Sequence, residues 1–162
     1  MSHPLYVSVS GSGDAAPEVN ALAEEVGALL ARAEAVVVCG GLGGVMEAVC
    51  RGAKSAGGRT VGILPGTDRT DANPYVDVAL PTGLGESRNA LIARAADVLI
   101  AIAGEFGTLS EIGLALKIGT PVVGLATWDL RRRGEAGEAI QTATSPAEAV
   151  AIAVSLGDAH RA

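Results

Sequence analysis

The 162-residue chain has few aromatic side chains and no excess of positive charge. Phe, Trp and Tyr make up 2% of its residues, and 12 lysines and arginines against 18 aspartates and glutamates leave a formal net charge of −6. Sequence-independent binding to a nucleic-acid backbone needs a basic surface, and binding of single strands needs aromatic side chains on which bases stack. We therefore expect no nucleic-acid partner.

Histidine and cysteine are equally scarce. The two histidines, His3 and His160, lie near the chain ends, which argues against a His-based catalytic triad or a His-rich metal site. The two cysteines, Cys39 and Cys50, lack CxxC spacing, so we expect reduced core residues. No metal site is expected.

A long hydrophobic run is also missing. No apolar segment approaches the roughly 20 residues of a membrane span, and the N-terminus lacks a basic stretch followed by an apolar run. We expect a cytoplasmic protein without a membrane partner.

Short apolar runs rich in Val, Ile and Leu are abundant instead. Six of them fit buried parallel strands, and a seventh is a candidate: residues 5–9, 36–39, 60–64, 76–80, 98–102, 121–125 and, as the candidate, 139–143. Helical periodicity separates most of them, at residues 17–33, 44–56, 87–96, 108–118 and 146–156. The exception is a surface loop at 65–74. The alternation predicts a single Rossmann-like α/β domain over residues 1–162, with a parallel sheet of six to seven strands and helices on both faces.

Glycine-rich turns follow four of the predicted strands. Their sequences are Ser10-Gly-Ser-Gly-Asp14, Gly40-Gly-Leu-Gly-Gly-Val-Met-Glu47, Thr82-Gly-Leu-Gly-Glu-Ser-Arg-Asn89 and Gly104-Glu-Phe-Gly-Thr108. One such turn alone is weak evidence, because tight turns use glycine in proteins that bind nothing there. Four turns at one edge of a parallel sheet favour a phosphate or nucleotide site. Neither the dinucleotide fingerprint nor the phosphate-loop motif is present, which disfavours an ordinary NAD enzyme or a phosphate-loop ATPase.

Two charged residues beside these turns have alternative interpretations. Thr108 to Glu111 fits a capping box, with Thr108 as the N-cap, but Glu111 beside an anion site also suits an acid or base. Arg88 is either an exposed residue after a Ser87 cap or an anion ligand; arginine at a helix N-terminus opposes the helix dipole, which favours the second role. Glu105 would repel a phosphate unless its carboxylate points away.

The ordered motifs of residues 5–128 resemble the LOG-like Rossmann superfamily. This group is also called lysine-decarboxylase-like or DNA-processing-protein-A-related, and its bacterial branch includes molybdenum cofactor carrier proteins. The motifs that carry the resemblance are the Gly40 and Thr82 turns, Gly62-Ile-Leu-Pro-Gly66, Asn73-Pro-Tyr-Val-Asp77, Ala96-Asp97 and Gly107-Thr-Leu-Ser-Glu111.

The characterised LOG enzymes split nucleoside 5′-monophosphates into base and ribose 5-phosphate, and their hallmark is PGGxGTxxE with an arginine before it. The resemblance implies that Gly104, Gly107 and Thr108 hold phosphate, that Arg88 and Glu111 are the catalytic residues, and that no cofactor is required. This chain departs from the hallmark, because Ala103 and Glu105 replace its proline and second glycine. The usual arginine-lysine pair is Arg88-Asn89, as in the carrier-like branch.

The turns and the resemblance together give the candidate ligand contacts. They are Gly11, Ser12, Gly40, Gly41, Gly44, Met46, Thr82, Asn89, Gly104, Phe106, Gly107 and Thr108. Two functions remain open: a phosphoribohydrolase that uses Glu111 and Arg88 on a nucleoside monophosphate, or a non-catalytic carrier of a nucleotide or of molybdenum cofactor, a pterin phosphate. Both predict a small-molecule phosphate ligand.

The resemblance also bears on assembly, and the lysine content bears on the decarboxylase label. Relatives are commonly homodimers or larger, so it implies a homo-oligomer. Lysine decarboxylation is disfavoured, because a pyridoxal-phosphate enzyme needs a Schiff-base lysine and the only lysines, Lys54 and Lys117, lie near predicted helix C-termini.

Overall fold

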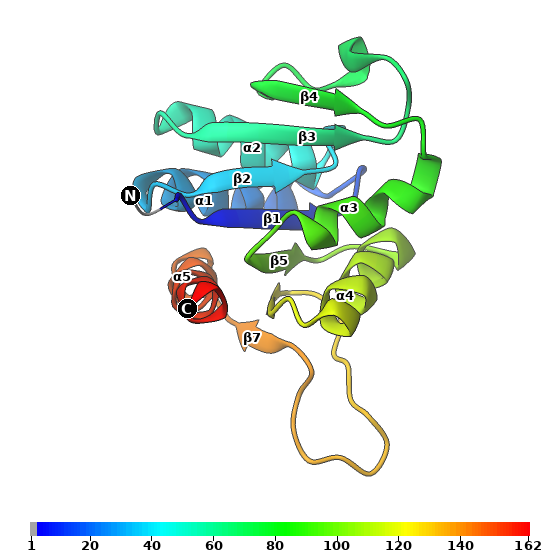
Figure 1. Cartoon of the computed structure of the whole chain (residues 1–162). Helices are drawn as coiled ribbons and strands as arrows, with labels where there is room; N and C mark the ends of the chain where they lie inside the picture. Colours follow the sequence, from blue (N-terminus) through cyan, green and yellow to red (C-terminus); the bar gives the residue numbers. More distant parts are fainter. Residues whose placement is uncertain (1–2) are drawn as a thin grey trace.

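The computed structural model describes residues 3–162 and contains one seven-stranded sheet. All neighbouring strands pair in parallel, in the order β4-β3-β2-β1-β5-β6-β7 (Figure 1). The strands span Tyr6–Gly11 (β1), Val36–Cys39 (β2), Arg59–Leu64 (β3), Val78–Pro81 (β4), Val98–Ile102 (β5), Val122–Leu125 (β6) and Gln141–Ala143 (β7). The predicted parallel α/β sheet and its candidate seventh strand are confirmed; β4 begins two residues later than predicted.

Five α-helices cover both faces of the sheet, as predicted. They span Pro17–Arg32 (α1), Val45–Ser55 (α2), Asn89–Arg94 (α3), Phe106–Ile118 (α4) and Pro146–Arg161 (α5). Helices α1, α2 and α5 share one hydrophobic core with the sheet, while α3 and α4 pack together in front of it in Figure 1. No helix within residues 3–162 is long and apolar enough to cross a membrane.

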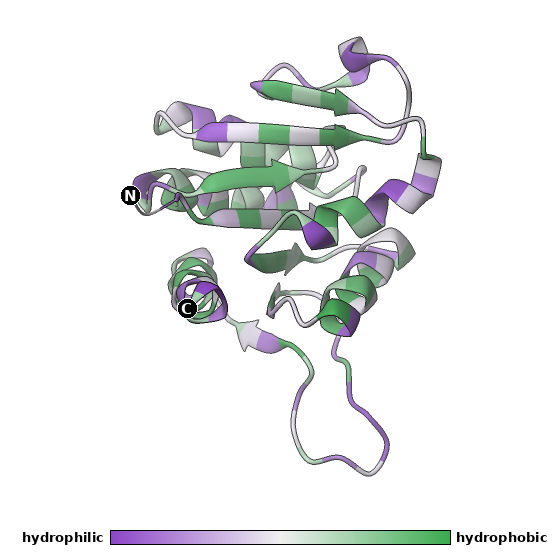
Figure 2. Ribbon diagram, viewed as in Figure 1, coloured by the Kyte–Doolittle hydropathy of each residue, from purple (hydrophilic) through white to green (hydrophobic). Residues whose placement is uncertain are grey.

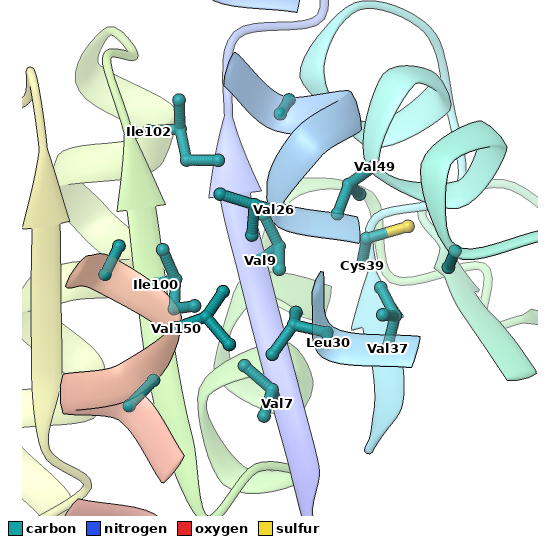
Figure 3. Close-up of a cluster of buried hydrophobic side chains, with 14 of the residues drawn as sticks. Val7, Val9, Val26, Leu30, Val37, Cys39, Val49, Ile100, Ile102 and Val150 are labelled. Atoms are coloured by element: carbon teal, nitrogen blue, oxygen red, sulfur yellow. The ribbon is translucent and has the colours of Figure 1, made fainter. Parts of the chain in front are cut away.

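The main core lies between the sheet and helices α1, α2 and α5. Strand β2 is buried and hydrophobic along its whole length (Figure 2), as its run of three valines predicts for a strand covered on both faces. Figure 3 shows Val7 and Val9 of β1 facing Val26 and Leu30 of α1. The core therefore fixes the strands whose carboxyl ends carry the glycine turns.

Both cysteines belong to this core. Cys39 ends β2 and Cys50 lies in α2; both are free and buried, as predicted, with their sulfur atoms 3.5 Å apart. The Cys39 sulfur accepts a hydrogen bond from the Gly41 N–H group, over 3.3 Å. The pair thus lies directly beneath the turn that follows β2.

Three local predictions need correction. Helix α4 begins at Phe106, not Thr108, with Glu105 as its N-cap and no side-chain cap, so the capping box of Thr108 and Glu111 is wrong. No Ser87-capped helix forms either, because residues Gly85–Arg88 make a 3₁₀ turn that leads into α3. The 65–74 loop holds a further 3₁₀ turn, Arg69–Asp71.

The strand order creates a crevice at the middle of the sheet. From β1 the chain builds β2, β3 and β4 outward on one side, and from β5 it builds β6 and β7 outward on the other. In such sheets the connections leave β1 and β5 in opposite directions, which opens a space beyond their carboxyl ends. Ligands of open α/β sheets bind at this switch point.

Candidate functional site

A cavity of about 380 Å³ lies at the switch point, beyond the carboxyl ends of β1 and β5. Its walls come from the four glycine-rich turns and the start of the 65–74 loop. The lining residues are Val9, Ser10, Gly11, Ser12, Gly13, Gly40, Met46, Pro65, Gly85, Glu86, Arg88, Asn89, Glu105, Gly107, Thr108 and Glu111. The volume falls within the range of small-molecule sites.

The turn between β5 and α4 leaves backbone donors free for an anion. The first hydrogen bond of α4 runs from the Leu109 N–H group to the Glu105 carbonyl oxygen, so the N–H groups of Phe106, Gly107 and Thr108 precede the helical ladder. Gly107 and Thr108 line the cavity. The helix dipole adds positive potential at this end. The arrangement suits a phosphate group.

Gly104 shapes this turn without lining the cavity. Its φ is +94°, which favours glycine, and a β-carbon there would overlap the side chain of Thr108. Thr108 is itself buried against the turn. Gly104 thus allows the close packing that aims the first turn of α4 at the cavity.

The turn between β2 and α2 is held by its own chain. The Val45 N–H group donates to the Ser12 carbonyl oxygen over 2.9 Å, and Gly44 has a φ of +62°. Asn73 binds the same turn from the 65–74 loop: its N–H group donates to the Gly41 carbonyl oxygen and its side-chain amide donates to the Leu42 carbonyl oxygen, over 2.8 and 2.9 Å. These bonds make the turn a rigid wall.

Arg88 is buried between two strand ends. Its Nη1 donates to the carbonyl oxygens of Gly40 and Ile63, and its Nε donates to the Asn89 side-chain oxygen over 3.1 Å. Position 40 requires glycine, because a β-carbon there would lie 2.6 Å from Arg88 Nη1. Burial lowers the pKa of Arg88, and nearby Glu111 opposes that shift; the guanidinium still stays protonated.

One edge of the guanidinium remains available to a ligand. Within residues 3–162, the Nη2 atom of Arg88 makes no hydrogen bond. It is also not one of the buried side-chain atoms that lack a partner, so it is accessible to solvent. Because Arg88 lines the cavity, this nitrogen can donate to a phosphate oxygen. Arg88 therefore joins a structural role to a possible binding role.

Glu111 is buried on the second turn of α4 and reaches across to β1. The Ser10 hydroxyl donates to its Oε2, which replaces the predicted bond to a helix N-cap. Burial raises the pKa of Glu111 to about 7, and the positive charge of Arg88 acts against that rise. The carboxyl group therefore exchanges its proton near neutral pH, as an acid or base catalyst would.

The cavity brings together most, but not all, of the residues named from sequence. Arg88, Glu111, Gly11, Ser12, Gly40, Met46, Asn89, Gly107 and Thr108 line it; Gly41, Gly44, Thr82, Gly104 and Phe106 do not. Gly41, Gly44 and Gly104 have positive φ values and closely packed neighbours. Thr82 donates its hydroxyl proton to the Leu64 carbonyl oxygen over 2.7 Å. Phe106 lies outside the cavity on the exposed side of α4.

Sequence reasoning missed Ser10 and Asn73. Ser10 is the hydrogen-bond partner of Glu111, and its only signal in the sequence was a hydroxyl just after the end of a predicted strand that also contains Ser8. Asn73 is buried against the β2–α2 turn although it belongs to a segment predicted as a surface loop. Its signal was the asparagine-proline step in a motif that carried the family resemblance.

Two exposed acidic residues also line the cavity. Glu86 and Glu105 line it and are exposed, and Glu105 is the N-cap residue of α4. Arg88 is the one cationic residue among those that line the cavity. An anion in the cavity is therefore held mainly by backbone N–H groups and Arg88, against the repulsion of these two carboxylates.

The model of the SLOG cluster4 family matches residues 4–156. The chain belongs to this family. An uncharacterized protein of Archaeoglobus fulgidus is 42% identical over 121 residues, which cover 75% of this chain and 80% of that protein.

Two solved structures share nearly the whole fold. The molybdenum cofactor binding protein of the phototrophic bacterium Rippkaea orientalis is 34% identical, with a TM-score of 0.86 and coverage of 95% of this chain and 98% of that one. The molybdenum cofactor carrier protein of Chlamydomonas reinhardtii is 32% identical, with a TM-score of 0.81 and the same coverage of each chain. The resemblance to the LOG-like superfamily and its carrier branch is thus confirmed.

Proposed function

We propose that this protein binds and carries a phosphorylated pterin, of the molybdenum cofactor class, with its phosphate on the first turn of α4. The observation that carries the proposal is the set of free N–H groups in the first turn of α4, where Gly107 and Thr108 line the same cavity as Arg88. The likeness to two proteins that bind this cofactor over 95% of the chain supports the choice of ligand.

The donor set fits the phosphate end of such a cargo. Backbone N–H groups at a helix N-terminus and one arginine edge are the usual partners of a phosphate monoester. Within residues 3–162 no group of three or more His, Cys, Asp or Glu side chains is arranged to hold a metal ion. A carried metal would therefore be held through its pterin.

Purification from a bacterium that makes molybdenum cofactor tests the proposal. The protein is denatured, the released pterin is oxidised to its fluorescent phosphorylated product, and molybdenum is measured by mass spectrometry. We expect near-stoichiometric pterin phosphate with the wild type and a large loss with Gly107→Asp, which places a carboxylate at the phosphate position. Gly113→Asp is the matched control, since Gly113 is exposed on the same helix. A wild-type protein without phosphorylated pterin would reject the proposal.

A second candidate is hydrolysis of a nucleoside 5′-monophosphate. Its support is the Glu111 carboxyl, whose pKa of about 7 suits activation of water near an anomeric carbon. Against it, the Glu111 carboxylate already accepts a bond from Ser10, and Arg88 Nη1 is occupied by two carbonyl oxygens.

Ribose 5-phosphate release from a panel of nucleoside monophosphates decides this second candidate. Hydrolysis by the wild type that disappears in Glu111→Gln would establish it. The glutamine keeps the shape of the side chain and can still accept the Ser10 bond. A panel with no release leaves the carrier function as the proposal.

A further inference from the structure

A second hollow adjoins the phosphate cavity. It measures about 580 Å³ and is lined by Glu86, Ser87, Asn89, Ala90, Phe106, Gly107, Ser110 and Leu114. Three residues line both hollows: Glu86, Asn89 and Gly107. Helices α3 and α4, which lie side by side in Figure 1, supply most of its walls. The two hollows form one depression that a single ligand can occupy.

Phe106 forms the apolar end of this second hollow. Its side chain is 74% exposed, the largest exposure among the large hydrophobic residues of the described chain. It is the first residue of α4, next to Gly107. An exposed aromatic ring beside a binding cavity is a ready surface for stacking of a planar group.

The Phe106 ring packs against the ring of Trp128. The two ring centroids lie 5.7 Å apart with an interplanar angle of 41°, a favourable tilted arrangement. These are the only tryptophan and the only phenylalanine of the chain. In a sequence with so few aromatics, their pairing next to the cavity gives a ring that is oriented before any ligand arrives.

The residues shared by or next to both hollows are polar or have small side chains. The Asn89 amide donates to the Ser110 hydroxyl over 3.0 Å, and that hydroxyl donates to the Gly107 carbonyl oxygen over 2.7 Å. Apart from the neighbouring residues and the backbone of its own helix, no atom lies within 4 Å of the position that a Gly107 β-carbon would occupy. A flat group can therefore approach the helix backbone here and reach Phe106.

We propose that the second hollow is the subsite for the planar heterocycle of the ligand, with Phe106 as the stacking residue that selects ring-bearing phosphates over ring-free ones. The inference rests on the proposed phosphate site and adds the class of ligand that the site prefers. Its basis is the continuity of the two hollows and the exposed Phe106 ring packed against Trp128.

Calorimetric titration of the purified protein tests the subsite. The probes are a phosphorylated 6-alkylpterin, which has the ring, and ribose 5-phosphate, which lacks it. We expect Phe106→Ala to weaken binding of the pterin phosphate about ten-fold, within the range of measured base-stacking losses, and to leave ribose 5-phosphate unchanged. Phe106→Tyr should keep the wild-type preference. Leu84→Ala is the matched control, because Leu84 is 50% exposed yet lines neither hollow.

Trp128 supplies an independent signal. As the only tryptophan, it should report ring binding at Phe106 by a change in fluorescence that ribose 5-phosphate does not produce. Equal binding of both probes by the wild type, or an unchanged pterin phosphate affinity in Phe106→Ala, overturns the subsite but leaves the phosphate site intact. Failure of both probes to bind overturns the phosphate site as well.

Sedimentation measurements separate ligand binding from self-association. A Phe106→Ala variant that dissociates into monomers while keeping its pterin phosphate affinity would show that the ring belongs to an interface between copies of the chain, which also overturns the inference. We expect its sedimentation to match that of the wild type.

Discussion

The β2–α2 turn and the β5–α4 turn look alike in sequence but differ in how their polar groups are used. In the first turn, Asn73 and Arg88 bind main-chain oxygens and Ser12 accepts from the start of α2. In the second turn, the N–H groups of Phe106, Gly107 and Thr108 precede the first hydrogen bond of α4, and Gly107 and Thr108 line the cavity. Glycine content alone does not separate a supporting turn from a binding turn. The difference lies in the first backbone donor of each helix: within residues 3–162, the Val45 N–H group of α2 already donates to Ser12, whereas the Phe106 N–H group of α4 precedes the helical ladder without such a bond.

The largest expected effect is at Gly44, in the supporting turn. Gly44→Ala should lower the free energy of unfolding by about 4 kcal/mol, because a side chain there combines a strained φ of +62° with overlap on the Ser12 carbonyl oxygen. Gly57→Ala is the control, since Gly57 has a φ of +77° but no atom within 4 Å of the added carbon. It should lose only about 1 kcal/mol, as expected for strain alone. Urea unfolding followed by circular dichroism measures both; equal losses would contradict the role given to the overlap.

Arg88 ties the start of the supporting turn to the end of β3, so its loss should be next in size. Arg88→Met leaves the Gly40 and Ile63 carbonyl oxygens without their donor, and we expect a loss of about 3 kcal/mol in the free energy of unfolding. Arg94→Met is the matched control, because Arg94 is exposed at the end of α3 and should change stability by less than about 0.5 kcal/mol. A stable Arg88→Met protein that fails to bind phosphate would assign Arg88 to the ligand alone.

Glu111, which follows the binding turn on α4, gives the stability of the protein a pH dependence below neutrality. Its pKa is about 7 in the folded chain against 4.5 for an ordinary glutamate, so between these values the unfolded chain holds fewer protons. The free energy of unfolding should therefore fall as the pH rises from 4.5 to 7, by on the order of 2–3 kcal/mol. Glu111→Gln should remove this fall and be more stable than the wild type at pH 8. Urea unfolding at pH 5 and pH 8 checks it, and a wild-type fall that persists in the variant would contradict the assignment.

The sheet could be predicted from the sequence because its signal is local. The central apolar runs mark strands that are buried along their length, and helical periodicity between most of the runs favours parallel pairing. The strand order could not be predicted in the same way, because the local sequence of β5 does not identify β1 as the strand that pairs with it. The glycine-rich turns located the site once the strands were placed.

The errors lie where distant elements meet. The pattern from Thr108 to Glu111 has the spacing of a capping box, but the Glu111 carboxyl pairs with Ser10, which is 101 residues away in sequence. The sequence also allows an exposed Arg88 after a Ser87 cap. Its burial depends on the carbonyl oxygens of Gly40 and Ile63, which the fold alone brings to it.

The smallest expected change in stability, at Gly107, tests the comparison most directly. Gly107→Ala meets no atom within 4 Å and adopts no strained φ, so the free energy of unfolding should change by less than about 0.5 kcal/mol. The added methyl group nevertheless stands where a phosphate must approach the N–H groups, and we expect affinity for ribose 5-phosphate to fall several-fold by calorimetry. Gly113→Ala, with equally open surroundings on the same helix, should leave that affinity unchanged. If both variants bind like the wild type, the open donors of α4 do not hold the ligand, and the distinction between the two turns concerns folding alone.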